Sequence, residues 1–257
     1  MRNELLPFLL SMMILVSAVR TTPVAAQTKN LGVYDRPGFP QQSRSVTYAQ
    51  HGMVASSDLR ATQIALDILR AGGSAVDAAI AANAVLGVVE PMSCGIGGDL
   101  FAICWSPGDP MPVGLNASGR APQLATMEEF RRRDLQDIPT VGPLAWSVPG
   151  CVAGWHDLHG RYGKLPWPKL FEGAIQLAEE GFPVAPVIAS YWQGGESRLR
   201  ETPPAAETFL IDGQAPREGD IFRNPRLAAT YRRLASGGPQ EFYQGAIARE
   251  IDEYSRS

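Results

Sequence analysis

The feature that most constrains the fold of this chain is the stretch 75–89, which consists almost entirely of Ala, Val, Ile and Leu. Ser74 and Asp77 form an acidic variant of the capping box, which predicts that a helix begins here, and Pro91 ends it. A helix that is apolar all round must be buried on most of its faces, and its small side chains let neighbouring backbones approach closely. The fold must therefore supply other elements on several sides of this helix.

The regions on either side of this helix predict what lies next to it. Before it, apolar residues at helical spacing over 58–71 predict another helix, which Gly72 and Gly73 end. After it come a glycine loop, residues 94–99, and two short apolar runs, 100–105 and 112–116, separated by dense turn chemistry. These runs predict a β-hairpin.

Weaker patterns predict the rest of the chain. Thr126 and Glu129 form a capping box for a helix that carries the arginine run 131–133. Elsewhere we expect a strand over 47–55, and helices over 150–162, 168–181, from 224 to Gly237–Gly238, and through 247–254.

Composition excludes several partner classes. The chain has 257 residues, 23 basic and 26 acidic, so its net charge of -3 gives no electrostatic case for binding nucleic acid or an anionic membrane. The arginine run 131–133 is expected to be a solvated helix face, because Glu128 and Glu129 flank it.

The N-terminus predicts export. A basic start, an apolar stretch over 5–19 and the small residues Val24 to Ala26 predict a signal peptide, residues 1–26, with the exposed leader 27–45 and the folded part 46–257 behind it. The apolar stretch is shorter than the roughly 20 residues of a membrane span. We therefore expect a periplasmic or extracellular protein with no membrane span after the signal is removed.

Several candidate motifs in the sequence lack residues that their chemistry requires. Three cysteines give no disulfide framework, and Cys94, in the glycine loop, is expected to be a small buried thiol rather than a nucleophile. A dinucleotide-binding fingerprint needs a third glycine at the position where this chain has Leu100, so the glycine loop does not match that motif. His156 and His159 share a helix face but have no third ligand nearby, and no metal site is expected.

The polar segment 116–122, Asn-Ala-Ser-Gly-Arg-Ala-Pro, follows the second strand of the hairpin and should lie next to the glycine loop. Arg120 could hold a substrate carboxylate with two parallel hydrogen bonds. It could equally form a salt bridge or bind loop carbonyls, and the sequence leaves both alternatives open.

Several motifs in order resemble the start of the large subunit of the gamma-glutamyltransferase (gamma-glutamyltranspeptidase) family. They are Gly52-Met-Val-Ala-Ser-Ser-Asp58, the run from Ile68 to Ala79, Pro149-Gly150-x-Val-Ala-Gly154, Ala178-x-x-Gly181-Phe182 and Gly237-Gly-Pro-x-x-Phe242-Tyr-x-Gly245-x-Ile-Ala248. The resemblance covers residues 52–251.

The resemblance implies an α+β fold, the N-terminal nucleophile hydrolase αββα sandwich, of which this chain holds only part of the large subunit. It implies a precursor that cuts itself into a large and a small subunit. A threonine at the start of the small subunit then attacks a γ-glutamyl amide such as glutathione, and the acyl group passes to water or an amino acid. No cofactor is implied.

Two departures from the family pattern bear on activity. The chain is expected to end inside the large subunit, so that it contains no catalytic residue, needs the rest of the large subunit and the small subunit as partners, and is inactive alone. Typical members carry Arg-x-x-Ala-Pro, whose arginine binds the glutamyl carboxylate, whereas here Ser118 stands at that position and Arg120 two residues later. Ser118 and Arg120 are therefore the substrate-binding candidates.

The second departure, together with the Gly97-Gly-Asp-Leu-Phe101 loop, resembles the branch of the family that includes cephalosporin acylases. The expected substrate is therefore a small γ-glutamyl or related acyl amide. An alternative is a non-catalytic exported binding module derived from the same fold.

Overall fold

The computed structural model describes residues 47–256. The chain divides between Gln50 and His51, and the description below concerns the unit from His51 onward. The predicted signal peptide, 1–26, and leader, 27–45, lie outside the described residues. No helix in the described part of the chain is long and apolar enough to cross a membrane.

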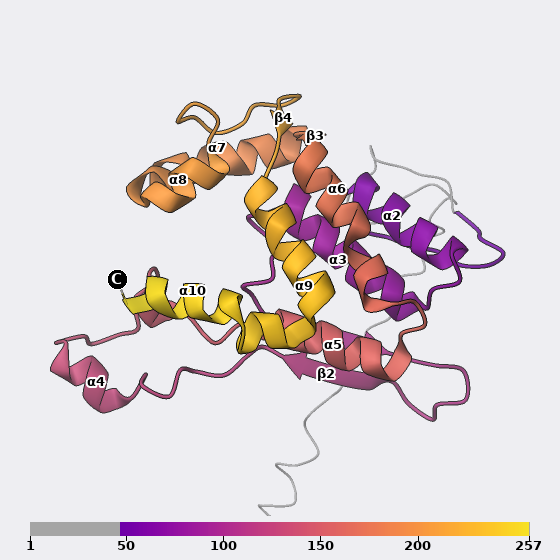
Figure 1. The fold of residues 1–257 in the computed structure, drawn as a ribbon, viewed down its shortest axis with the longest axis horizontal. Coiled ribbons are helices and arrows are strands. Elements are labelled where there is room, and N and C mark those ends of the chain that lie inside the picture. The colour runs from indigo at the N-terminus through magenta and orange to yellow at the C-terminus, as the bar shows by residue number, and fades with distance from the viewer. Residues whose placement is uncertain (1–46, 257) are drawn as a thin grey trace, which may run out of the picture. The chain divides into compact units, whose positions relative to one another are not determined.

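The apolar stretch forms helix α3 (Ala75–Val89), with the predicted bounds, and it packs against α2 (Leu59–Arg70) (Figure 1). Both halves of the predicted capping box are formed: Ser74 Oγ accepts from Asp77 N, and the Asp77 carboxylate accepts from Ser74 N. Asp77 Oδ2 also accepts from the backbone N–H groups of Lys164 and Leu165, at 2.9 and 3.2 Å. The start of α3 is thus tied to a segment almost 90 residues away.

Three further segments pack against α3: α5 (Cys151–Tyr162), the 3₁₀ turn η2 (Trp167–Phe171) and α6 (Glu172–Glu180). Helix α9 (Pro225–Tyr243) reaches it through Tyr231, whose hydroxyl donates to Ala84 O at 2.9 Å. The predicted burial of α3 is confirmed, since its residues Ala81, Ala84 and Val85 have no exposed surface. The polar Asn83 is accommodated because its Oδ1 accepts from Trp155 Nε1 at 3.0 Å.

The predicted hairpin is confirmed. Strand β1 (Leu100–Cys104) pairs antiparallel with β2 (Val113–Ala117), with Leu100 opposite Ala117. One face of the hairpin lies on α5 so closely that a Cβ at Gly154 would be 2.6 Å from Leu100 Cδ2. On the other face Phe101 and Ile103 are 64% and 83% exposed.

The C-terminal half is helical except for a small sheet, β3 (Phe182–Pro183) paired with β4 (Ile221–Phe222). The remaining elements are α4 (Met127–Arg132), the 3₁₀ turn η1 (Pro143–Ala145), α7 (Pro186–Glu201), α8 (Pro203–Phe209) and α10 (Ala246–Arg256). Helices α7 and α8 were not predicted from the sequence.

Three local predictions need correction. The strand over 47–55 is wrong: the described residues of this segment form no strand, and Met53 is 55% exposed. The capping box of α4 is only half formed, because the Glu129 side chain binds Arg132 and Arg133 instead of the backbone before the helix. This pairing does confirm the solvated arginine face.

The third correction concerns α9, which continues beyond Gly237–Gly238 rather than ending there. Gly238 has φ 65° and ψ -167°, which breaks the helix, and a second short helical piece runs from there to Tyr243. Arg233 holds the two pieces together, since its guanidinium binds Glu241 Oε1 at 3.1 Å. The glycine pair therefore makes a kink and not an end.

Candidate functional site

The site segment, residues 116–122, turns sharply where β2 ends. Asn116 Oδ1 accepts from Ser118 N at 3.0 Å, which closes an Asx turn, and Gly119 follows with φ 83°. Ser118 is half-buried and Arg120 is exposed. Both sequence-predicted residues thus lie on one tight turn that directly continues a strand.

The backbone before α5 fixes this turn in place. Val148 N donates to Arg120 O at 2.8 Å. A Cβ at Gly119 would lie 1.9 Å from Val148 O, and one at Gly150 would lie 2.1 Å from Ala117 O. The two backbones therefore touch with no side chain between them, which only glycine permits at these positions.

The glycine loop, residues 94–99, is fixed at the same place. Gly98 O accepts from both Gly150 N and Cys151 N, at 3.0 Å each. The expectation that the site segment lies next to the glycine loop is confirmed, because both meet the first residues of α5. Sequence reasoning did not identify this junction at Val148–Gly150, although Pro149-Gly150 belongs to the quoted motifs.

The guanidinium of Arg120 forms no hydrogen bond or ion pair with any other residue in 47–256. Only its backbone carbonyl is engaged, by Val148. The arrangement is a fixed backbone that carries an exposed, permanently charged group with five donors, suited to a carboxylate.

The two thiols near the loop are not activated. Burial raises the pKa of Cys94, and Glu90 adds to this effect. Burial also raises the pKa of Cys151 to about 12, helped by Cys94 and Asp99. Both therefore stay protonated at neutral pH, which disfavours a cysteine nucleophile. Cys151 is buried, whereas Cys94, which was expected to be buried, is half-buried.

The two histidines take part in packing. His156 and His159 lie edge-on to the Trp167 ring, with centroids 6.0 and 5.4 Å apart, and His159 Nε2 is 2.8 Å from Leu165 O. Among residues 47–256, no group of three His, Cys, Asp or Glu side chains is placed to hold a metal ion.

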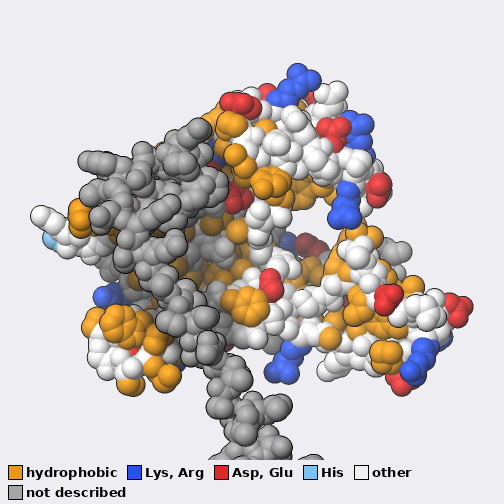
Figure 2. Space-filling view, turned by 180° about the vertical axis from the view of Figure 1, so that it is seen from behind, with side chains coloured by type: hydrophobic (Ala, Val, Ile, Leu, Met, Phe, Trp, Pro, Cys, Tyr) orange, Lys and Arg blue, Asp and Glu red, His pale blue; other side chains and the backbone are white. Residues whose placement is uncertain are grey.

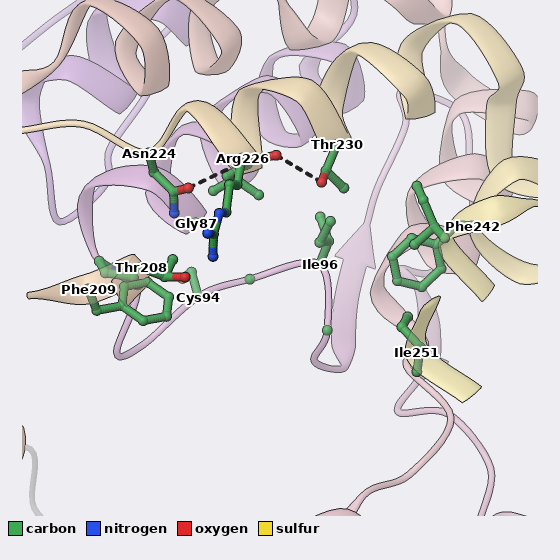
Figure 3. A pocket seen from close by; sticks show the side chains of 15 residues that line it. Gly87, Cys94, Ile96, Thr208, Phe209, Asn224, Arg226, Thr230, Phe242 and Ile251 are labelled. Atoms are coloured by element: carbon green, nitrogen blue, oxygen red, sulfur yellow. Dashed lines mark hydrogen bonds between the residues drawn. The ribbon is translucent and has the colours of Figure 1, made fainter. Parts of the chain in front are cut away.

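A cavity of about 400 Å³ lies on the glycine loop between helices α8, α9 and α10. Figure 3 shows Arg226 and Thr208 near Cys94 at one end and Phe242 with Ile251 at the other. Figure 2 shows the molecule from behind, where hydrophobic side chains lie at the surface among polar and charged ones. Neither Ser118 nor Arg120 lines this cavity, so the structure does not bring them into it.

The fold is that of the N-terminal nucleophile hydrolases, as expected from the sequence. The structure is similar to that of cephalosporin acylase from Bacillus halodurans, with a TM-score of 0.79 and 41% identity, over 86% of this chain and 42% of that one. The mixture of helices with a hairpin confirms the α+β class.

The family follows from the sequence comparisons. The family model described as gamma-glutamyltranspeptidase matches residues 61–256. The chain is 42% identical to the oxamate amidohydrolase proenzyme of Klebsiella pneumoniae over 216 residues, 80% of this chain and 40% of the relative. It is 36% identical to glutathione hydrolase 3 of Arabidopsis thaliana over 206 residues, 80% of this chain and 32% of the relative.

This chain belongs to the gamma-glutamyltranspeptidase family, and it spans 40% and 32% of the lengths of these two relatives. Both of these relatives bear the names of hydrolases.

Proposed function

We propose that the complete protein is an exported amide hydrolase or acyltransferase of this family, in which Arg120 binds a carboxylate on the acyl group of a small amide substrate. The observation that carries this proposal is the exposed Arg120 guanidinium on a backbone locked by Val148. A charged donor on a fixed support loses little entropy when it binds an anion, which favours a specific contact.

The named relatives suggest two kinds of carboxylate position. In oxamate the carboxylate is bonded directly to the amide carbonyl carbon, whereas in a γ-glutamyl amide three carbons separate the two groups. Arg120 stands two residues after the position of the arginine in typical members, where this chain has Ser118. We infer that the acyl group here differs from glutamate in the placement or presence of its charged groups.

The reaction requires a nucleophile from the remainder of the protein. We expect a threonine freed by self-cleavage to attack the amide carbonyl, with the substrate carboxylate held by Arg120 and the Ser118 hydroxyl available as a second donor. No cofactor is needed for this acyl transfer, and the chain 1–257 alone is expected to be inactive.

The decisive experiment compares Arg120 variants of the complete protein on three substrates: a γ-glutamyl anilide, a glutaryl anilide and oxamate. Loss of a charge-assisted hydrogen-bond pair predicts that Arg120→Ala lowers kcat/KM for the preferred substrate by about ten- to a hundred-fold. Arg120→Lys keeps the charge but not the paired geometry, and should fall between the wild type and Arg120→Ala.

The matched control is Arg131→Ala, because Arg131 is also an exposed arginine but lies on α4. It should leave all three activities unchanged, and a denaturing gel should show normal self-cleavage of every variant. Unchanged kinetics of Arg120→Ala with all three substrates would show that Arg120 serves only the structure of the loop.

Export is the second part of the proposal, supported by the signal-peptide pattern over residues 1–26. Fractionation of the source cells should recover the protein outside the cytoplasm, and N-terminal sequencing of the mature form should begin at Gln27. A mature protein that keeps Met1 would contradict export by this signal.

A further inference from the structure

The N-terminus of α5 lacks a cap of its own. The N-cap residue is Gly150, which has no side chain to satisfy the first N–H groups of the helix. A residue with a capping side chain cannot stand here, because its Cβ would lie 2.1 Å from Ala117 O and 2.6 Å from Gly119 N. The close contact between Gly150 and the site segment therefore leaves no room for a capping side chain at this position.

Tyr243, the last residue of α9, supplies the missing cap from elsewhere in the chain. Its hydroxyl accepts from Ala153 N at 3.0 Å and donates to Pro149 O at 2.7 Å. Helix α9 contacts α5, and its second piece ends beside it (Figure 1). One hydroxyl thus joins Pro149, the residue before the N-cap of α5, to Ala153, the third residue of that helix.

Further bonds connect this hydroxyl to the site segment. Gly150 N and Cys151 N hold Gly98 of the glycine loop, and Val148 N holds Arg120 O. Pro149 lies between these donors, so a shift of its carbonyl moves both contacts. Burial raises the pKa of Tyr243, which keeps the proton that the bond to Pro149 requires.

The kink of α9 sets the position of the tyrosine. The break at Gly238 redirects the last turn, and Arg233 fixes the angle by binding Glu241 beyond the kink and Glu250 on α10 at 3.0 Å. Phe242 is buried next to the tyrosine, with ring centroids 5.0 Å apart. The hydroxyl is therefore held by a rigid support.

We propose that Tyr243 is a positioning residue for substrate binding: by capping α5 in place of Gly150, it fixes the backbone that carries Arg120. This inference rests on the proposed function of Arg120. It assigns no contact between Tyr243 and the substrate, and its effect on binding passes through the junction Val148–Gly150.

The test uses Tyr243→Phe in the complete protein, which removes the hydroxyl and keeps the ring. We expect faster hydrogen exchange at the amides of Val148, Gly150 and Ala153. Loss of the cap also predicts a KM for the preferred carboxylate-bearing substrate that rises about five- to twenty-fold, with a smaller change in kcat. In the Arg120→Ala background the same substitution should change KM less than about two-fold, because the two residues act as one unit.

Two controls separate positioning from general stability. Tyr231→Phe removes another buried tyrosine hydroxyl, the one that donates to Ala84 O in α3, and should lower the thermal midpoint without raising KM. Tyr191→Phe alters a tyrosine that is 65% exposed and should change neither the thermal midpoint nor KM.

Three results would overturn the inference. Unchanged amide exchange in Tyr243→Phe would show that the hydroxyl does not hold the junction. Faster exchange with unchanged KM, while Arg120→Ala does lower kcat/KM, would reject the positioning role and leave the proposed function intact. If Arg120→Ala itself leaves kcat/KM unchanged with all three substrates, the carboxylate clamp is wrong and the role of Tyr243 fails with it.

Discussion

Helix α3 and the β1–β2 hairpin are both strongly apolar, but their surroundings differ. In α3 most side chains are buried, with Ile80 only 2% exposed, although Ala75 and Ala79 reach the surface. In the hairpin one face is covered by α5, while on the other face Ile103 is 83% exposed. Apolar content alone therefore does not tell how much of an element is covered within residues 47–256.

The difference teaches what each region needs from the rest of the protein. The helices around α3 cover most of it and supply hydrogen-bond partners for Asn83 and for the Ala84 carbonyl. The outer face of the hairpin shows the apolar alternation of a strand whose second face belongs against another layer. That is the arrangement expected of one strand pair in an αββα sandwich.

The largest effect is expected where the helical region is tied together, at Asp77. Asp77→Ala removes the acceptor of three part-buried hydrogen bonds, those from the N–H groups of Ser74, Lys164 and Leu165, and should lower the free energy of unfolding by about 4 kcal/mol. Chemical unfolding of the complete protein should show this as a lower free energy of unfolding. A loss of less than about 1 kcal/mol would mean that the hairpin side, and not α3, limits stability.

Asp77→Asn is the matched control. All three backbone bonds go to Oδ2, and Oδ1 is buried without a hydrogen-bond partner in the described residues. An amide with its oxygen at the Oδ2 position keeps those bonds, so the loss at neutral pH should stay near 1 kcal/mol.

The same residue makes stability depend on pH. Burial opposes ionisation of Asp77, but the hydrogen bonds from Ser74, Lys164 and Leu165 outweigh it and lower its pKa. A pKa lowered in the folded state gives stability that is complete above the ordinary value and lost as the pH falls through the folded value. The advantage of the wild type over Asp77→Ala should therefore shrink between about pH 5 and pH 2.

A smaller effect is expected at Gly119, where the hairpin continues into the site segment. Gly119→Ala combines a φ of 83° with a Cβ 1.9 Å from Val148 O, and should cost about 3 kcal/mol and most of the activity. Gly108→Ala shares the positive φ of 97° but meets nothing within 4 Å, so about 1 kcal/mol is expected. Equal costs in chemical unfolding would show that the site segment can move away from Val148.

The smallest effect is expected on the outer face of the hairpin. It decides whether this face, unlike the surface of α3, is uncovered in the complete protein as well. If a second layer covers it, Ile103→Ala should cost about 2 kcal/mol in the complete protein. Ile138→Ala, at a residue that is 67% exposed in a loop, should cost less than about 0.5 kcal/mol. Thermal midpoints that do not differ between the two variants would mean that the hairpin faces water on that side.

The sequence was sufficient wherever a local pattern decides the structure. The bounds of α3 and its capping box follow from composition and from Ser74 with Asp77, and the hairpin follows from its turn residues. Helix α7 was missed because Gly194 and Gly195 interrupt the helical pattern of its sequence. Only a few of its side chains are buried, among them Ile188 and Trp192. Its stability comes from tertiary contacts that a propensity argument does not include.

The candidate site was predicted only in part, for the same physical reason. The turn at 116–122 could be located, because Asn116 and Gly119 are turn residues. The way in which this turn is fixed could not be predicted, because its contacts with Val148 and Gly150 are backbone contacts between distant segments. Tyr243 stands 94 residues from Pro149, and nothing in the local sequence of either residue indicates the bond.

The cap that Tyr243 provides also has a consequence for the order of events during synthesis. Its hydroxyl leaves the ribosome 90 residues after Ala153, the residue whose N–H it satisfies. At about 5 to 20 residues per second, α5 waits roughly 5 to 18 seconds for this partner. Helices α2 and α3, which are adjacent in sequence, can pair long before that. The nascent chain therefore builds its helical core first and leaves the site segment unsecured until α9 has emerged.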